Sequence, residues 1–208
     1  MIALPAGKTA TDEATTARQG GEPAGFDPAA GVFIALLARP PELGPVDLVA
    51  LSPFQRGLLV IDGTVTKFIE AYALEPVEVV RLAQGEAHLR MADRWLDLPA
   101  SAPVIRRRVM LRGRRTGRFF VWADSLIAAE RLAPAMRQAL EREGGGLGRI
   151  LVDTGAETRR EGLWYGRERR ADAPREVAAA WQGDYLTRSY RVLAGARPMM
   201  LITERFPL

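Results

Sequence analysis

Two charged residues occupy positions where the alternation of a β-strand turns them towards apolar neighbours. Side chains alternate between the two faces of a strand, so every second residue lies on the same face. In the segment 198–206, Glu204 shares its face with three large apolar residues, Met200, Ile202 and Phe206. In the segment 104–112, Arg107 shares its face with three aliphatic residues, Ile105, Val109 and Leu111. The pattern therefore predicts that one acid and one base, from different strands, point into the core.

Two interpretations of this acid and base are open on the alternation alone. A buried charge is costly without a partner, and a structural ion pair between Arg107 and Glu204 would satisfy both groups. Alternatively, the two side chains face a ligand pocket, where a guanidinium suits bidentate recognition of a carboxylate. The neighbouring Arg106 and Arg108 alternate to the opposite face together with Arg112, where we expect them to be solvated.

The composition excludes several kinds of chemistry. The chain has 208 residues, no cysteine and a single histidine, His88, which rules out a thiolate zinc site, a cysteine nucleophile and a multi-histidine metal site. His88 lies in a polar stretch, and we expect it at the surface. The 29 basic and 25 acidic residues give a net charge of +4 and a pI of about 9.9. Because 27 of the basic residues are arginine, which titrates above about 12, the high pI needs no nucleic-acid partner.

Other charged or glycine-rich segments have ordinary structural interpretations. Residues 143–149 are glycine-rich but lack the Gly-Lys-Ser/Thr ending of a P-loop. We interpret them either as the end of a helix or as a mobile loop whose backbone amides approach a ligand. Four arginines cluster at an expected hairpin tip, Arg112, Arg114, Arg115 and Arg118. A solvated turn is favoured over an anion contact there, and no aromatic residues are interleaved as single-strand binding would require.

The elements that must position these residues are hairpins and separate helices. Strands are predicted over residues 77–82, 104–112, 118–127, 185–193 and 198–206, with hairpin turns at 113–117 and 194–197. Helices are predicted over residues 47–59, 66–71 and 130–143, and Ser52-Pro53 can start a second short helix within the first of these. Strands beside strands, with helices set apart, predict an α+β fold on an antiparallel β-sheet.

The N-terminal part of the chain differs from the rest. Residues 1–45 contain Thr-rich and Gly/Pro-rich stretches and predict a flexible extension ahead of an ordered domain at residues 46–208. The first residues have no basic stretch followed by a long apolar one, and no apolar segment is long enough to span a bilayer. We therefore expect a soluble, cytoplasmic protein. The residues do not indicate an oligomeric state.

Several segments in the same order resemble one enzyme family. They include Arg197-Pro-Met-Met-Leu-Ile-Thr-Glu-Arg-Phe-Pro207 and the ranges 51–70, 105–113, 121–127, 147–151 and 189–193. Together they resemble the chorismate pyruvate-lyases, or 4-hydroxybenzoate synthases, over roughly residues 48–208. The resemblance implies a single domain with an antiparallel sheet, helices on one side, and an enclosed pocket for an aromatic acid under mobile flaps.

The resemblance also implies roles for particular residues. Arg107 matches an arginine that holds the ring carboxylate, and Glu204 matches a glutamate that contacts the ring hydroxyl. Leu147 and Val65 match residues whose backbone binds the same substrate. A further cation is expected for the second, enolpyruvyl carboxylate, with Lys67 and Arg56 as candidates. Some family members carry an arginine where this chain has Asp124, so a secondary site using that charge is in doubt here.

The implied reaction converts chorismate to 4-hydroxybenzoate and pyruvate, for ubiquinone biosynthesis or another aromatic pathway. Aromatisation of the ring drives it, so no metal or other cofactor is expected, and the protein mainly orients a dianion and excludes water. Glu204 either accepts the ring proton or only positions the substrate. Two alternatives stay open: a lyase for a related enolpyruvyl ether, and a non-catalytic module that binds a small aromatic or anionic ligand, as in effector domains of transcription regulators with a similar fold. Residues 1–45 are too short and too Gly/Pro-rich for a helix-turn-helix, which favours the enzyme.

Overall fold

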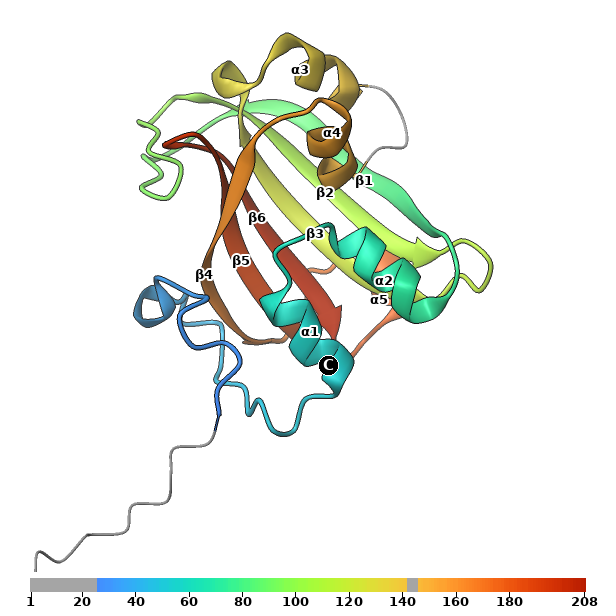
Figure 1. The fold of residues 1–208 in the computed structure, drawn as a ribbon. Helices are drawn as coiled ribbons and strands as arrows, with labels where there is room; N and C mark the ends of the chain where they lie inside the picture. Colours follow the sequence, from blue (N-terminus) through green and yellow to red (C-terminus); the bar gives the residue numbers. More distant parts are fainter. Residues whose placement is uncertain (1–25, 142–145) are drawn as a thin grey trace, which may run out of the picture.

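The computed structural model describes residues 26–141 and 146–208 and has one six-stranded antiparallel sheet (Figure 1). Its strands are β1 (Val77–His88), β2 (Pro103–Gly113), β3 (Phe119–Ala128), β4 (Thr158–Glu168), β5 (Tyr185–Ala194) and β6 (Arg197–Pro207). They lie side by side in the order β1-β2-β3-β6-β5-β4. Within the first three and within the last three strands, neighbours in the sequence pair antiparallel, and β3 pairs with β6 to join the two halves. The predicted α+β fold is confirmed.

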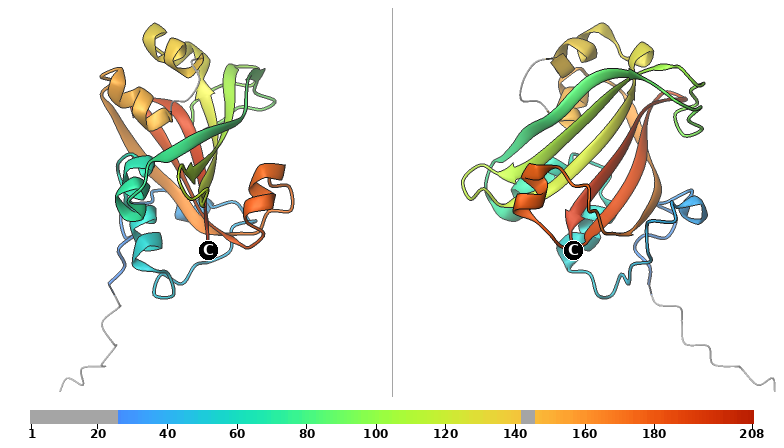
Figure 2. Two further views of the ribbon diagram at one scale, coloured as in Figure 1. Left: turned by 90° about the vertical axis from the view of Figure 1, so that its right-hand side faces the viewer. Right: turned by 180° about the vertical axis from the view of Figure 1, so that it is seen from behind.

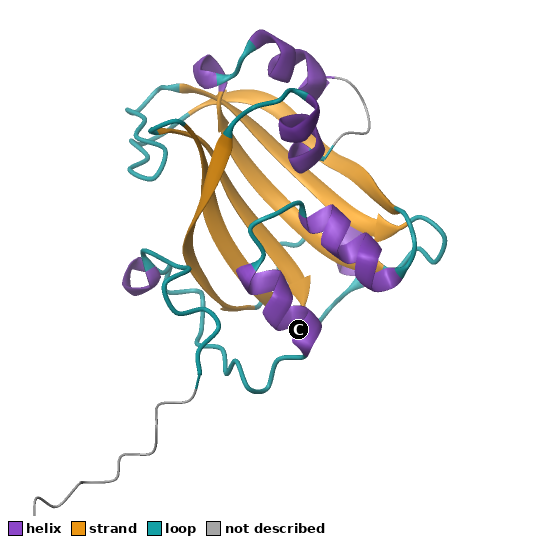
Figure 3. Cartoon of the chain, viewed as in Figure 1, coloured by secondary structure: helices purple, strands orange, loops and turns teal. Residues whose placement is uncertain are grey.

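Four helices cover one face of the sheet. They are α1 (Pro53–Val60), α2 (Val65–Ala73), α3 (Pro134–Glu141) and α4 (Leu147–Asp153) (Figure 3). Leu58 and Ile69, from α1 and α2, pack with Val109 and Val121, while Leu140 and Ile150, from α3 and α4, pack in a second apolar cluster that includes Ile127 and Met200. A fifth helix, α5 (Arg175–Ala180), was not predicted and lies on the opposite face, where Val177 packs against Trp122 and Tyr185 (Figure 2). Two short 3-10 helices, Leu36–Ala38 and Ala129–Arg131, complete the elements.

The start of α1 differs from the prediction for a physical reason. A helix was predicted over residues 47–59, but residues 48–51 form a turn and a bend and α1 begins at Pro53. Ser52 has extended backbone angles, as expected for a residue before proline, and its hydroxyl accepts the Gln55 backbone N–H in a capping box. The second, shorter helix that Ser52-Pro53 was predicted to start is therefore the helix that forms.

Other boundaries were shifted or missed. The strand predicted over residues 77–82 continues to His88 after a bulge between Arg81 and Ala83. The helix predicted over residues 130–143 is split, because a 3-10 turn precedes Pro134 and α3 starts at that proline; residues 142–145 lie outside the described part. Strand β4 and helix α4 were not predicted.

Part of the segment predicted as an N-terminal extension packs on the outer edge of β4. The Ile34 N–H donates to the Gly162 carbonyl at 2.9 Å, and the Gly44 N–H donates to the Arg167 carbonyl at 2.8 Å. A Cβ at Gly162 would lie only 2.5 Å from the Val32 carbonyl oxygen, so the approach requires glycine. Residues 33–44 thus cover a sheet edge, and residues 1–25 lie outside the described part. Within the described residues, no helix has the length and apolarity needed to cross a bilayer.

Candidate functional site

Arg107 points inward from the middle of β2, as the alternation predicted. It is 4% exposed, and its Nη1 donates to the Gln84 side-chain oxygen on β1 at 2.6 Å. Sheet register places one row of neighbouring residues across the five strands β1, β2, β3, β6 and β5: Gln84, Arg107, Ser125, Ile202 and Tyr190. Burial, helped by the charge of Arg81, lowers the pKa of the Arg107 guanidinium, which nevertheless stays charged because arginine titrates so high.

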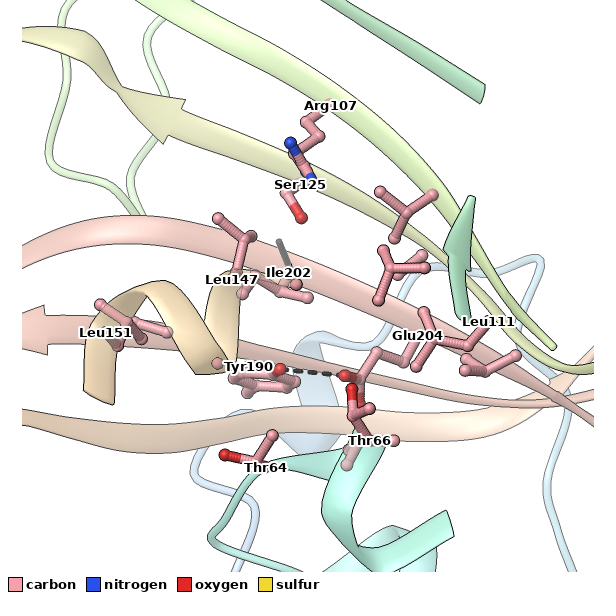
Figure 4. Close-up of a pocket in the computed structure, with 18 of the residues that line it drawn as sticks. Thr64, Thr66, Arg107, Leu111, Ser125, Leu147, Leu151, Tyr190, Ile202 and Glu204 are labelled. Atoms are coloured by element: carbon pink, nitrogen blue, oxygen red, sulfur yellow. Dashed lines mark hydrogen bonds between the residues drawn. The ribbon is translucent and has the colours of Figure 1, made fainter. Parts of the chain in front are cut away.

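Glu204 points to the same side of the sheet from β6, again as predicted. It is 7% exposed, and both of its carboxylate oxygens accept hydrogen bonds. Arg188 Nε donates to Oε2 at 2.8 Å, and the Tyr190 hydroxyl donates to Oε1 at 3.0 Å (Figure 4). Burial raises the pKa of the Tyr190 hydroxyl, and the negative charge of Glu204 raises it further, so Tyr190 remains a proton donor in this bond.

The interpretation of a structural Arg107–Glu204 ion pair is wrong, because Glu204 is paired with Arg188 instead. Arg107 and Glu204 lie two strands apart and are offset by two residues along the strands. With strands about 4.8 Å apart and about 3.4 Å per residue, their Cα atoms are separated by about 12 Å. The two side chains therefore stand at opposite ends of a space rather than in contact.

That space is a pocket enclosing about 630 Å³, part of it open to solvent. Its floor between Arg107 and Glu204 is apolar, formed by side chains of the sheet, Val109, Leu111, Val121, Ala123 and Ile202. Its cover comes from the starts of two helices, with Thr64 and Thr66 at α2 and Leu147 and Leu151 on α4 (Figure 4). A cation at one end, a carboxylate at the other and apolar walls between them suit a flat ring that carries an acid group and a hydroxyl.

The two residues expected to offer backbone groups both line this pocket. Val65 is the first residue of α2, and Leu147 is the first residue of α4. The first N–H groups of a helix have no acceptor within the helix, so they are available to other partners. Gly148 allows the two helix starts to approach each other, because a Cβ there would lie 2.9 Å from Thr64 Cγ2.

The structure does not bring Lys67 or Arg56 into the pocket. The Lys67 side chain is 80% exposed and its ammonium pairs with Glu70 at 2.7 Å, along the outer surface of α2. Arg56 donates to the backbone carbonyls of Leu48 and Leu51 and so anchors the loop before α1. The pocket is instead lined by another cation, Arg160 on β4, which sequence reasoning missed.

Arg188 and Tyr190 were also missed. Besides Glu204, Arg188 Nη1 donates to the carbonyls of Leu59 and Ile61 at 3.1 Å each, which ties the carboxylate to the end of α1. The alternation of residues 185–193 places Arg188, Tyr190 and Val192 on one face, but Thr187 and Ser189 make the other face polar as well, so the sequence carries no clear period-2 signal there.

The remaining predicted features lie elsewhere. His88 is exposed at the end of β1, as expected, and Arg106 and Arg112 are exposed. Arg108 is only half-buried rather than fully solvated, because its Nε pairs with Asp124 at 2.6 Å on the face opposite the pocket. The glycine-rich residues 143–149 fall partly outside the described part, and the structure describes only their end at 146–149.

Comparisons with known proteins point to one family. A sequence profile described as chorismate pyruvate-lyase Rv2949c-like matches residues 59–208. The chain is 29% identical over 160 residues to the chorismate pyruvate-lyase of Mycobacterium tuberculosis (strain ATCC 25618 / H37Rv), covering 73% of this chain and 78% of that protein. It is 27% identical over 162 residues to that of Mycobacterium leprae (strain TN), covering 73% and 72%. The effector domain of PhnF from Mycobacterium smegmatis shares the fold, with a TM-score of 0.54 at 13% identity over 70% of this chain and 88% of that one.

Proposed function

The chain belongs to the chorismate pyruvate-lyase Rv2949c-like family and is an enzyme of this lyase class, and we propose that it eliminates pyruvate from chorismate to give 4-hydroxybenzoate. The observation that carries the proposal is the opposition of Arg107 and Glu204 across one apolar-walled pocket. Chorismate has a ring carboxylate and a ring hydroxyl at opposite ends of a flat ring, which matches this arrangement.

Substrate binding follows from the charges and the backbone groups. Arg107 holds the ring carboxylate with charge-assisted hydrogen bonds, for which a planar guanidinium is suited. The backbone at Val65 and Leu147 adds contacts at the helix starts. The apolar floor packs against the ring and keeps water away, so the dianion is held in one orientation.

The reaction itself breaks one C–H and one C–O bond. The ring carbon that carries the hydroxyl loses its proton, the C–H electron pair becomes a ring double bond, and the neighbouring C–O bond to the enolpyruvyl group breaks. The leaving enolpyruvate takes up a proton and becomes pyruvate, and the ring becomes aromatic. Glu204 accepts a hydrogen bond from the ring hydroxyl. Because both of its carboxylate oxygens already accept hydrogen bonds, from Arg188 and Tyr190, we favour positioning by Glu204 and internal transfer of the proton to the enolpyruvyl methylene.

Incubation of the purified protein with chorismate tests the proposal. Pyruvate is followed by a coupled lactate dehydrogenase assay and 4-hydroxybenzoate by its ultraviolet absorbance after chromatography, and equimolar release of the two is expected. No release of pyruvate would refute the lyase proposal. Pyruvate released from a related enol ether, but not from chorismate, would instead support the alternative substrate.

Two variants test the residues. Arg107→Ala and Glu204→Gln are each expected to lose most of the activity, by about 10²-fold or more, while keeping the native circular dichroism spectrum. Arg106→Gln is the matched control, because this neighbouring arginine is exposed on the opposite face and should retain full activity. Unfolding of the two site variants would show that their role is structural.

The alternative of a non-catalytic binding module is supported by the shared fold of the effector domain of PhnF. A module of that kind would bind 4-hydroxybenzoate or a similar acid without turnover of chorismate, so the same incubation separates the two functions. We further propose that the enzyme acts in the cytoplasm and supplies ubiquinone biosynthesis or another aromatic pathway.

A further inference from the structure

A second cavity adjoins the catalytic pocket on the side of β4. This outer cavity encloses about 700 Å³, part of it open to solvent, between β4, β5 and the end of α1. Its walls include Phe33, Leu59 and Ile61, and two residues, Arg160 and Tyr190, line both this cavity and the catalytic pocket. They therefore form the boundary between the two spaces.

Positive charge at this boundary is weakly balanced. The Arg160 side chain is 19% exposed, and its ion-pair partner, Asp62, lies 3.8 Å away with 77% of its side chain exposed. The other arginine in the wall of the outer cavity, Arg188, pairs with Glu204 at 2.8 Å, and among the described residues its buried Nη2 makes no hydrogen bond. An anion beside Arg160 would gain an interaction that the exposed Asp62 does not supply.

The order of the strands places Arg160 where the second carboxylate of the substrate must go. Arg107 lies on β2, Glu204 on β6 and Arg160 on β4, so the three follow one another across the sheet. With the ring carboxylate at Arg107 and the hydroxyl at Glu204, the enolpyruvyl group on the carbon next to the hydroxyl projects to one side of the line between these two residues. Strand register places Arg160 to one side of the same line, because Arg160 is level with Val192 on β5 and with Met200 on β6, four residues from Glu204. The strands beyond β6 are β5 and β4, the walls of the outer cavity.

We infer that Arg160 binds the enolpyruvyl carboxylate, and that the outer cavity receives the small 2-oxo acid formed when the C–O bond breaks. This inference rests on the proposed function, and it gives to Arg160 the role for which Lys67 and Arg56 were candidates. Arg160 takes no part in the proton transfer. It binds the enolpyruvyl carboxylate and so orients the side chain before the C–O bond breaks.

Comparison of two ligands tests the role of Arg160, because 4-hydroxybenzoate lacks the enolpyruvyl side chain. Arg160→Gln is expected to raise the KM for chorismate about 10- to 100-fold, the usual effect of losing a charge-assisted hydrogen bond, and to leave the Kd for 4-hydroxybenzoate unchanged. Arg160→Lys should recover part of the loss. Arg159→Gln is the matched control, since Arg159 is the preceding residue on β4, is mostly exposed and pairs with Glu161.

The outcomes separate this inference from the proposed function. An unchanged KM in Arg160→Gln, or an equal loss of affinity for chorismate and 4-hydroxybenzoate, overturns the role of Arg160. If the wild-type protein releases no pyruvate, the proposed function fails, and calorimetric Kd values for chorismate and 4-hydroxybenzoate still decide the role of Arg160. Retained affinity for 4-hydroxybenzoate also shows that the variant is folded.

Discussion

Replacement of Arg188 by methionine tests how the carboxylate of Glu204 is held. Arg188 is 3% exposed, and it donates to Glu204 and to the carbonyls of Leu59 and Ile61. Removing one partner of a buried ion pair costs about 3–5 kcal/mol because the other charge stays buried without compensation. Total stabilities of domains are about 5–15 kcal/mol, so Arg188→Met should remove a large part of the stability. At about 2–4 °C per kcal/mol for a domain of this size, the Tm falls by roughly 6–20 °C.

Urea denaturation of a double-mutant cycle measures the pair itself. Glu204→Leu alone should also destabilise strongly, because it leaves the buried Arg188 without its acid. The double variant Arg188→Met/Glu204→Leu should lie within about 2 kcal/mol of the wild type, since apolar residues often replace a buried pair without loss. It should nevertheless be inactive. The exposed pair Arg112–Glu78, at 3.0 Å, is the control and should show a coupling of about 0–1 kcal/mol in the same cycle.

A small effect would refute this reasoning. If Arg188→Met costs less than about 1 kcal/mol, the pair is not a buried ion pair of the expected strength. If the two single effects simply add in the double variant, Arg188 and Glu204 act independently, and the carboxylate is held by Tyr190 alone.

Two further predictions concern the approach of the helix starts and the hairpin between β2 and β3. Gly148→Ala places a methyl group 2.9 Å from Thr64 Cγ2 and should raise the KM for chorismate about tenfold, because overpacking costs about 1–3 kcal/mol. Adding Thr64→Ser, which removes Cγ2, should restore part of the lost affinity. The Thr116 hydroxyl, with backbone N–H groups of Arg115 and Thr116, holds the pKa of the Glu75 carboxyl below its usual value. Glu75 therefore stabilises the fold at pH values above its pKa in the unfolded chain, and this contribution is lost as the pH falls through its lower pKa in the folded protein. The difference in unfolding free energy between wild type and Glu75→Gln, measured in urea, should therefore shrink from pH 6 to pH 3. A constant difference would contradict this.

The alternation of side chains identified Arg107 and Glu204 because each is flanked on its face by apolar residues. No such contrast exists around Arg188, where the buried opposite face also carries hydroxyls: Thr187 donates to Glu168, and Ser189 bonds to Thr203. A strand that is polar on both faces gives no period-2 signal, and its buried hydrogen bonds are visible only when the partner strands are placed.

Strand β4 was missed for a related reason. Arg159 and Glu161 lie on one face, where Glu161 pairs with Arg191, and Arg160 lies on the other, so three successive charged residues conceal the strand. The position of Arg160 depends on register with β5 at the edge of the sheet, which is a long-range property. Lys67 was misjudged because its neighbours Val65 and Thr66 face the pocket, whereas its own side chain projects from the outer surface of α2.

The two faces of the sheet use buried charge in different ways, and this explains how an arginine-rich chain can serve a small acidic substrate. On the face that α5 covers, Asp124 accepts from Arg108 and Arg205, and Glu168 accepts from Arg205 and Arg170, so acids and bases neutralise one another beside Trp122. An added anion there would have to displace an acid that is already bonded. On the pocket face, Arg160 pairs only at 3.8 Å with the solvent-exposed Asp62 among the described residues, so a bound carboxylate would gain charge neutralisation at little cost. The position of the acids, more than the net charge of +4, is therefore the reason that we propose this face for a dianionic substrate.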